Sequence, residues 1–391
     1  MREGSGLSGV ELLTIDIPAI MSPVEMGRVD RSAIPQLLDE ARQDADQANM
    51  FMRLSVLFSS LGALELAREM HDRALQWRRI FRYSCKQSPT VRLLAVMGEG
   101  WGLENAPVEY LLENSDIQLW LVFLDAEGRL PVAIPDHDIV LIGLGEDSRK
   151  TAQFEKLISV FSAWPRPLIN RPEFVLNCAR DRVYGFFKEV PGLAVADTRV
   201  MSRKNVSIDC FPKIIRPVDS HGGDGLAKIA DENMLSAYLE THADDLFYVI
   251  DYVDYRSPDG LFRKMRIALI DGKPYICHLA ISDDWIVHYI PAGMEFSAGK
   301  RAEEEALMHS FDQDFAVEHE ATLRCIHEKL GLDYVVLDCS LLPDGRLLLF
   351  EADSRAWIHA VDPVAIFPYK PPVMQKAFDA FRTMLLQRLG R

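Results

Sequence analysis

The chain has 391 residues, of which 48% are hydrophobic and 26% are charged, a composition typical of a globular protein with about two or three domains. Its formal net charge of -15 argues against nucleic acid and anionic membranes as partners, and no basic run offsets it. Six dispersed cysteines without a C-x-x-C spacing argue against a zinc ribbon and a secreted disulfide framework. The sequence shows neither a stretch of about 18 apolar residues nor a signal peptide, so we expect a cytoplasmic protein that acts on small molecules or proteins.

Residues 1–88 are predicted to form a helical region. A short helix is expected near residues 32–45, and residues 49–81 carry apolar or small side chains at helical spacing on two runs that divide at Leu61-Gly62. These two runs resemble one tetratricopeptide repeat, whose packing positions would be Phe51, Leu54, Ser55, Phe58, Ala67, His71 and Ala74. One repeat cannot bury its own apolar face, so the helical pair must dock on another surface. It is a candidate for structural packing, for homodimer formation or for binding a protein partner.

Residues 89–198 are predicted to form a parallel, Rossmann-like α/β layer. Three short apolar runs are expected to be strands, and a helix is expected between the first two. The strands are residues 91–97, 117–124 and 137–144, and the helix is residues 105–115. A proline-rich connector with a helix near residues 175–188 leads into a third region, residues 199–391, which ends in a helix near residues 372–389.

Three carboxylates are predicted to share one face of a hairpin within residues 333–357. Asp344-Gly345 lies between two apolar runs and predicts a two-residue turn, which places Asp338 directly opposite Glu351. Strand alternation puts Asp353 on the same face as Glu351. Opposed like charges are destabilising, and Mg²⁺ prefers carboxylate oxygens, so these three acids are candidate metal ligands. The alternative is a polar sheet face on which the acids point apart into solvent.

A second hairpin is expected within residues 261–282, with its turn at Asp271-Gly272. The register gives a cationic face made of Lys264, Arg266, Lys273 and Tyr275. A cationic face opposite the acidic one would suit a metal-bound triphosphate between two sheets. The alternative is that these cations are simply solvated.

A glycine-rich loop lies in the segment RPVDSHGGDGLAKI, residues 216–229. Glycines without side chains allow successive backbone N–H groups to converge on a phosphate, and neighbouring polar side chains add donors. The residues concerned are Ser220, His221, Gly222, Gly223 and Gly225. The segment is therefore either a loop that covers phosphate or an ordinary surface turn.

Taken in this order, the segments resemble the ATP-grasp superfamily over roughly residues 91–391, most closely the branch of glutathione synthetase, ribosomal-protein glutamate ligase and the D-alanine ligases. FPKIIRPVDSHGGDGLAKI is similar to the family's flexible loop, FYVIDYVDY to its adenine-contacting strand, and LGLDYVVLDCSLLPDGRLLLFEAD to its metal hairpin. The resemblance implies an ATP-grasp fold of two α+β subdomains in residues 199–391, after the Rossmann-like layer.

The resemblance also implies which residues bind nucleotide. Arg182 and Arg216 stand where the family has phosphate-binding lysines, and arginine retains the charge and binds phosphate oxygens in pairs. Asp251 occupies the acidic position of the adenine-contacting strand. Lys264 on the second hairpin joins this nucleotide-binding set.

For the metal and the chemistry, Asp338 and Glu351 match the family's metal carboxylates, whereas Asp353 replaces its usual asparagine. Arg266 and Arg355 are the candidate catalytic residues, and Arg355 is expected to hold the activated carboxylate. Further candidates for substrate contact are His278, Trp285, His288, Tyr289 and His359. A lone histidine on a strand is equally often a core residue with its hydrogen bonds satisfied.

The function implied by the resemblance is an ATP-dependent ligase that joins a carboxylate to an amine or thiol through an acylphosphate, with release of ADP and phosphate. The expected cofactors are ATP and Mg²⁺, with Mn²⁺ as an alternative metal, and the expected substrates are small molecules or peptides. Two other functions remain open: a nucleotide-binding scaffold with a degenerate ATP-grasp domain, and a small-molecule kinase.

Overall fold

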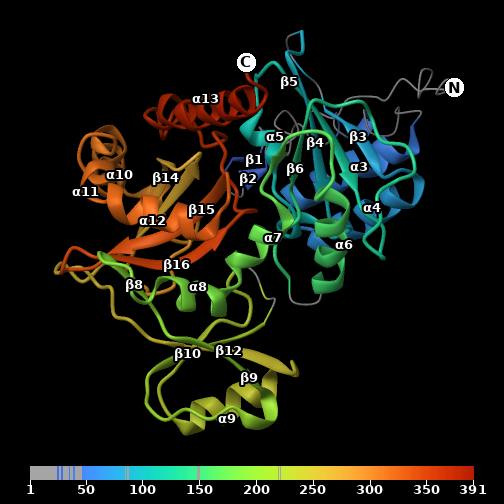
Figure 1. Cartoon of the computed structure of the whole chain (residues 1–391). Helices are drawn as coiled ribbons and strands as arrows, with labels where there is room; N and C mark the ends of the chain where they lie inside the picture. The colour runs from blue at the N-terminus through green and yellow to red at the C-terminus, as the bar shows by residue number, and fades with distance from the viewer. Residues whose placement is uncertain are drawn as a thin grey trace, which may run out of the picture. The chain divides into compact units, whose positions relative to one another are not determined.

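The computed structural model describes residues 46–391 except 84, 86, 87, 148, 149, 219 and 221, and a few residues between 24 and 39. The helix expected near residues 32–45 falls largely outside the described residues. Strands β1 (Val24–Glu25) and β2 (Arg28–Val29) form a short antiparallel pair. The chain folds into two compact units (Figure 1). The first unit contains Met1–Gly145, Gln153–Pro172 and Ser354–Arg391, and the second contains Glu146–Ala152 and Glu173–Asp353.

The first unit is built around a five-stranded sheet of order β3-β5-β4-β6-β7. Its strands are β3 (Ile80–Arg82), β4 (Val91–Met97), β5 (Ile117–Phe123), β6 (Ile139–Ile142) and β7 (Leu168–Ile169). All pairs are parallel except β3 with β5. The apolar runs of β4, β5 and β6 are almost wholly buried, as expected for strands covered on both faces. The predicted parallel α/β layer is confirmed.

The predicted helical pair is present as α3 (Gln47–Ser60) and α4 (Leu64–Trp77). Asp46 caps α3 by accepting hydrogen bonds from the backbone amides of Ala48 and Asn49, at 3.0 and 3.2 Å. Gly62 adopts a φ of +75° in the connection, at the predicted break. The helices exist as predicted, whereas their likeness to a tetratricopeptide repeat stays a prediction.

Beyond residue 77, the helices described in the first unit are η1 (Gly102–Glu104), α5 (Val108–Leu111), α13 (Lys370–Arg388) and all but the first two residues of α6 (Thr151–Phe161). The helix expected over residues 105–115 is thus only a short α5. Arg382 of α13 binds Asp116 with two hydrogen bonds of 2.6 and 2.7 Å. The hydrogen bonds from Arg382 lower the pKa of Asp116 to about 2. The C-terminal segment belongs to the first unit, whereas the sequence placed it in the third region, and this ion pair is one of its contacts with the α/β layer.

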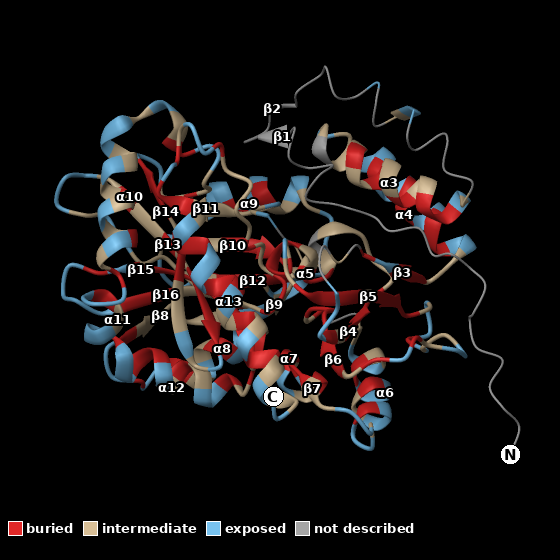
Figure 2. Cartoon of the chain, turned by 90° about the horizontal axis from the view of Figure 1, so that it is seen from above, coloured by how far each residue is buried: buried red, intermediate tan, exposed pale blue. Residues whose placement is uncertain are grey.

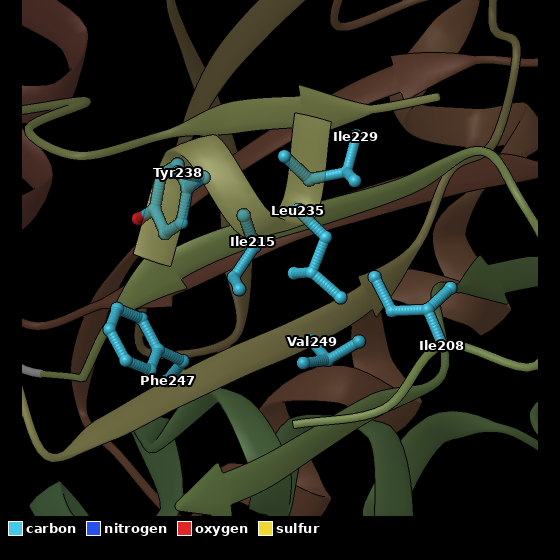
Figure 3. Close-up of a cluster of buried hydrophobic side chains, with 7 residues drawn as sticks. All are labelled: Ile208, Ile215, Ile229, Leu235, Tyr238, Phe247 and Val249. Carbon is cyan, nitrogen blue, oxygen red and sulfur yellow. The ribbon is translucent and has the colours of Figure 1, made fainter. Parts of the chain in front are cut away.

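The second unit contains a lobe, here called the small lobe (residues 198–251), whose sheet has the order β11-β10-β12-β9. Its elements are β9 (Thr198–Ser202), η4 (Arg203–Asn205), β10 (Lys213–Pro217), β11 (Ala227–Ile229), α9 (Glu232–Thr241) and β12 (Leu246–Asp251). Helix α9 packs on one face of this sheet. The core between them contains Ile208, Ile215, Ile229, Leu235, Tyr238, Phe247 and Val249, whose side chains converge in Figure 3.

The other lobe of the second unit, here called the large lobe (residues 173–195 and 262–353), has a five-stranded sheet of order β14-β13-β15-β16-β8. Its strands are β8 (Leu193–Val195), β13 (Phe262–Ile270), β14 (Lys273–Ser282), β15 (Tyr334–Leu341) and β16 (Leu347–Asp353). Its helices are α7 (Pro172–Val175), η3 (Leu176–Cys178), α8 (Arg180–Phe187), η5 (Met294–Phe296), α10 (Ala298–Ser310), α11 (Phe315–Glu318) and α12 (Glu320–Leu330). The two predicted α+β subdomains are therefore present.

Two boundaries differ from the sequence-based expectations. Residues 173–198, expected in the middle region, begin the second unit because β8 pairs in parallel with β16. The helix expected near residues 175–188 is interrupted at Ala179, whose ψ of 132° is not helical, and α8 begins after it. Buried residues concentrate on the strands of each main sheet (Figure 2). Among the helices described here, none combines the length and the apolar character needed to cross a membrane.

Replacing Phe247 with alanine tests the small-lobe core. The ring is fully buried, so its loss should lower the opening free energy of this lobe by about 3–5 kcal/mol. Leu246→Ala, at the neighbouring exposed position, should change it by less than about 0.5 kcal/mol. Amide hydrogen exchange in β10 and β12 measures both effects, and equal effects would contradict the assigned core.

Candidate functional site

The hairpin of β15 and β16 places Asp338 directly opposite Glu351, as the sequence predicted. The turn itself differs from the prediction. The amide of Leu342 donates to the carbonyl of Arg346 at 2.9 Å, so residues 343–345 form the turn, with Gly345 at a φ of +84°. The resulting one-residue offset is reversed by a bulge beside Asp338. The predicted pairing is therefore correct, although the geometry assumed for the turn is wrong.

A row of facing side chains crosses four strands of the large-lobe sheet. His278 faces Arg266, Arg266 faces Asp338, and Asp338 faces Glu351. We call these four residues the charged row. Directly opposed residues point to the same face of a sheet, so cations and acids lie side by side. The expectation that the cationic hairpin lies on a sheet opposite the acidic one is wrong, because β13 pairs directly with β15.

Asp338 is the most strongly held member of the charged row. Its carboxylate accepts hydrogen bonds from Nε and Nη2 of Arg266, at 2.8 and 3.0 Å, and from Nζ of Lys264 at 3.1 Å. Only 9% of the Asp338 side chain is exposed. Burial disfavours the charged carboxylate, but the nearby positive charges of Arg266 and Lys264 outweigh it and hold the pKa of Asp338 well below its usual value.

Glu351 is paired with Arg180, which sequence reasoning missed. Nη2 of Arg180 lies 2.6 Å from Oε1 of Glu351. Burial opposes the charge on Arg180, yet Glu351 and Asp353 together raise the pKa of Arg180. Arg182, named from the sequence, is exposed and has no ion pair in the described part of the chain. Residues two apart on a helix point in nearly opposite directions, so once α8 begins at Arg180 that residue, rather than Arg182, faces the sheet.

Arg216 of β10 brings the small lobe into electrostatic contact with the large lobe. The residue is buried, and its Nε donates to Oγ of Ser220 at 2.9 Å, while Nη2 donates to the carbonyl of Ser220. Burial, followed by the positive charge of Arg180, lowers the pKa of Arg216 to about 10, and Glu351 partly opposes this effect. Arg180, Arg216 and Glu351 thus form one cluster across the two lobes.

The glycine-rich loop adjoins this cluster, because Ser220 accepts hydrogen bonds from Arg216. Gly222, Gly223 and Gly225 have φ values of +63°, +84° and +64°, which side-chain-bearing residues rarely adopt. A Cβ atom at Gly223 would lie 2.7 Å from Nε2 of His288, so the loop backbone packs closely against this side chain of the large lobe. His221, the other predicted phosphate donor, lies outside the described residues.

His288 belongs to the same site. Burial, and then the positive charge of Lys264, lower the pKa of His288, and Asp338 partly opposes them. Other residues predicted to contact substrate make interactions within the large lobe. Tyr289 donates to the buried Glu304 at 2.9 Å, and its ring lies 4.7 Å from that of His278. The carbonyl of Trp285 accepts a hydrogen bond from Tyr255 at 2.6 Å.

Asp251, predicted to contact nucleotide, ends β12 and forms an ion pair with Lys213 of the adjacent strand. Its side chain is 49% exposed. Next to it, Nζ of Lys228 stacks 3.4 Å from the centre of the Tyr252 ring. An aromatic face with a cation lies beside the strand predicted to contact adenine.

The predicted metal ligands lie on one face but are already compensated by cations. Asp353 faces Val336, two residues along β16 from Glu351, and therefore shares its face. Across the residues that the structure describes, no three His, Cys, Asp or Glu side chains are grouped to hold a metal ion. The donor types suit Mg²⁺, but Asp338 and Glu351 are bound to arginine and lysine side chains in this conformation.

Two predicted residues lie in the first unit. Arg355 is buried, and a Cβ atom at Gly145 would lie 1.7 Å from its Cδ, so its side chain packs directly on that glycine. The ring of His359 lies 6.3 Å from that of Tyr110. In this unit both residues are part of the packing between the C-terminal segment and the α/β layer.

Comparison with known proteins gives matches among solved structures only. No family model matches the sequence, and no curated protein matches it. A D-alanine–D-alanine ligase from Bacillus anthracis is 15% identical, with a TM-score of 0.48 over 77% of this chain and 99% of that one. An ATP-grasp RimK domain protein from Sphaerobacter thermophilus is 14% identical, with a TM-score of 0.46 over 75% and 99%. The VanG D-Ala:D-Ser ligase from Enterococcus faecalis is 13% identical, with a TM-score of 0.45 over 76% and 99%.

Asp338→Asn should destabilise the second unit at neutral pH. The substitution leaves Lys264 and Arg266 buried without their counter-charge, which typically costs about 3–5 kcal/mol in free energy of unfolding. The folded-state pKa of Asp338 is depressed, so its contribution is present above an unfolded value of about 4 and is lost as pH falls toward the folded value. The difference between wild type and variant should therefore narrow below about pH 4.

Urea unfolding at pH 7 and pH 3 measures this difference. Asp344→Asn is the matched control, because Asp344 pairs with Arg346 at the exposed hairpin tip and its loss should have little effect at either pH. A variant difference that is as large at pH 3 as at pH 7 would show that the pair is not the source of the stability.

Proposed function

We propose that this protein is an ATP-dependent ligase of the ATP-grasp type, which joins a carboxylate to an amine or thiol. The observation that carries the proposal is the convergence of four cations on the acids of the charged row, next to a glycine loop that contacts Arg216 and His288. The cations are Arg180, Arg216, Lys264 and Arg266. Such clusters of fixed cations suit the phosphates of a nucleotide. The two lobes, with their loop and hairpin in the expected order, support the same proposal.

The chemistry follows from the poor reactivity of a carboxylate. An amine cannot displace oxide, so a carboxylate oxygen first attacks the γ-phosphorus of ATP, and the bond from that phosphorus to the β–γ bridging oxygen breaks. ADP leaves and an acylphosphate forms. The amine or thiol then attacks the acyl carbon, the carbon–oxygen bond to phosphate breaks, and the nucleophile loses its proton. Both steps depend on alignment and on neutralisation of phosphate charge.

The arginines provide that neutralisation. Arg180 and Arg216 stay protonated at neutral pH and can each bind two phosphate oxygens. Lys264 and Arg266 lie on the adjacent strand face and add further positive charge where the transferred group would pass. Asp338 and Glu351 keep Lys264, Arg266 and Arg180 gathered at one place, so the positive charge is already concentrated where phosphate would bind.

Asp338, Glu351 and Asp353 would hold Mg²⁺, or Mn²⁺, which would supply Lewis-acid neutralisation of the phosphate oxygens. Metal binding there requires Arg180, Lys264 and Arg266 to turn from the carboxylates toward phosphate. ATP supplies that alternative partner, so we infer that nucleotide and metal bind together. The paired carboxylates also keep the nucleotide-binding scaffold as the second candidate function.

The glycine loop would exclude water from the acylphosphate. Gly223 already approaches His288, and a side chain at this position would clash with His288 unless the histidine moved. Closure of the loop over the phosphates would protect the intermediate from hydrolysis.

A turnover screen tests the proposed reaction. The full chain is incubated with ATP, Mg²⁺ and pools of amino acids, peptides and small carboxylates, and ADP, phosphate and condensed products are measured. Release of ADP should require both a carboxylate and an amine or thiol. Glu351→Gln should lower turnover by about 10²-fold or more, because phosphate charge is less well neutralised. Glu328→Gln, an exposed change in the same lobe, should leave it unchanged.

Each other outcome points to a different function. ADP with a phosphorylated product and no condensation would identify a kinase. AMP with pyrophosphate would identify adenylation. ATP binding without turnover in any pool, unaltered in Glu351→Gln, would identify the scaffold.

Gly223→Ala should weaken ATP binding about tenfold, because alanine resists a φ of +84° and its Cβ meets His288. Adding His288→Ala should restore part of this loss, since it removes the clash and leaves the backbone cost. Gly345→Ala is the control, because Gly345 has the same φ of +84° and open space around it. ATP affinity is measured by calorimetry, and an unaltered affinity in Gly223→Ala would remove the loop from the nucleotide site.

A further inference from the structure

The first unit contains a cavity of about 110 Å³ that the proposed ligase chemistry does not use. Helices α3 and α4 lie beside β3 and β5 (Figure 2), and the cavity lies among these elements and the loop that follows β4. The lining residues come from α3, α4, β4, β5 and α5, from Tyr83 directly after β3, and from the C-terminal segment. The residues used below are His71, Tyr83, Trp101, Glu109, Tyr110 and Trp357.

The loop after β4 is built to a fixed shape. Oδ1 of Asn105 accepts from the amide of Gly98 at 2.7 Å, and its Nδ2 donates to the carbonyls of Gly98 and Gly100 at 3.1 and 2.7 Å. A Cβ atom at Gly100 would lie 1.9 Å from Oε2 of Glu104, so the Glu104 carboxylate packs directly on this glycine. The loop leaves the carboxyl end of β4, whose neighbours β5 and β6 lie on opposite sides. Open α/β sheets bind ligands at such positions.

Glu109 brings a carboxylate to the cavity wall. Apart from a hydrogen bond from its own backbone, this carboxylate has no hydrogen-bond or ion-pair partner within the described part of the chain. Burial raises the pKa of Glu109 to about 7. Burial, and then the charge of Glu109, raise the pKa values of Tyr83 and Tyr110, so both phenols lie close to it. The acid lacks the positive partner that a buried carboxylate normally has.

His71 contributes a neutral polar group. Its Nδ1 is buried without a hydrogen-bond partner, and the residue is only 4% exposed. Burial is the main reason that the pKa of His71 is lowered to about 4, so the ring does not repel a cation at neutral pH. Aromatic faces complete the walls: the rings of Tyr110 and Trp357 lie 5.5 Å apart, and Trp101 also lines the cavity.

We propose that this cavity binds a small organic cation of the alkylammonium class. A carboxylate without a counter-ion and several aromatic faces are the groups that recognise such cations. The cavity volume limits the size of the ligand. A cavity of about 150 Å³ holds benzene, and this cavity is smaller, so it has room for about four heavy atoms. The inference is independent of the proposed ligase reaction and concerns only the first unit.

Three probes with four heavy atoms each have similar size but different charge, so they show the effect of ligand charge on binding. The probes are isopropylammonium, isopropanol and acetate. Binding to the full chain at pH 8 is measured by calorimetry and by the change in tryptophan fluorescence. Isopropylammonium should bind with a Kd on the order of 1 mM, as expected for so small a ligand, and at least tenfold more tightly than isopropanol. Acetate should not bind. Equal binding of isopropanol, or a preference for acetate, would overturn the proposal.

Variants locate the site. Glu109→Gln should weaken isopropylammonium at least tenfold, and Trp101→Leu should weaken it severalfold. Glu65→Gln, an exposed change on α4, should have no effect. If the Glu109→Gln variant does not fold, the comparison of the three probes on the wild-type chain is sufficient to test whether the cavity prefers a cation. Loss of binding in Glu65→Gln equal to that in Glu109→Gln would show a general charge effect and overturn the site. ATP turnover is not part of any readout, so this proposal and the ligase proposal fail separately.

Discussion

The buried carboxylate of Asp338, held between Arg266 and Lys264, is the interaction on which the second unit depends. It lies where β13, β15 and β16 meet, so the three strands share one electrostatic centre. A buried acid of this kind is tolerated only with its cations in place. The same cations must serve a nucleotide in the proposed reaction. In the absence of ligand, the site is therefore stabilised by ion pairs with Asp338. A bound nucleotide would have to replace these ion pairs with its own contacts to Arg266 and Lys264.

Much of the fold could be predicted from the sequence because its signals are local. The strands β4, β5 and β6 are continuous apolar runs that can be recognised without the rest of the chain. A turn such as Asp271-Gly272 fixes the register of the residues next to it. The predicted pairing of Asp338 with Glu351 is correct, although the turn is one residue longer than predicted. The bulge beside Asp338 shifts the register back by one residue and so compensates for the longer turn. Local patterns cannot reveal such compensating offsets.

Other features depend on contacts between distant segments. The residue at which α8 begins decides whether Arg180 or Arg182 faces the sheet. The non-helical backbone of Ala179 makes α8 begin at Arg180. Whether the two hairpins face each other or lie in one sheet depends on the pairing of β13 with β15, whose residues lie far apart in sequence. The cavity around Glu109 is assembled from both ends of the chain, so no single segment carries its signal.

The division of the chain between the two units also affects the order in which the chain can fold. The first unit includes the C-terminal helix α13, whereas the second unit, apart from Glu146–Ala152, is one continuous stretch. During synthesis a chain emerges from its N-terminus, and domains generally fold as units. The second unit is complete before α13 has been made. The first unit, whose synthesis begins first, is therefore the unit whose fold is completed last.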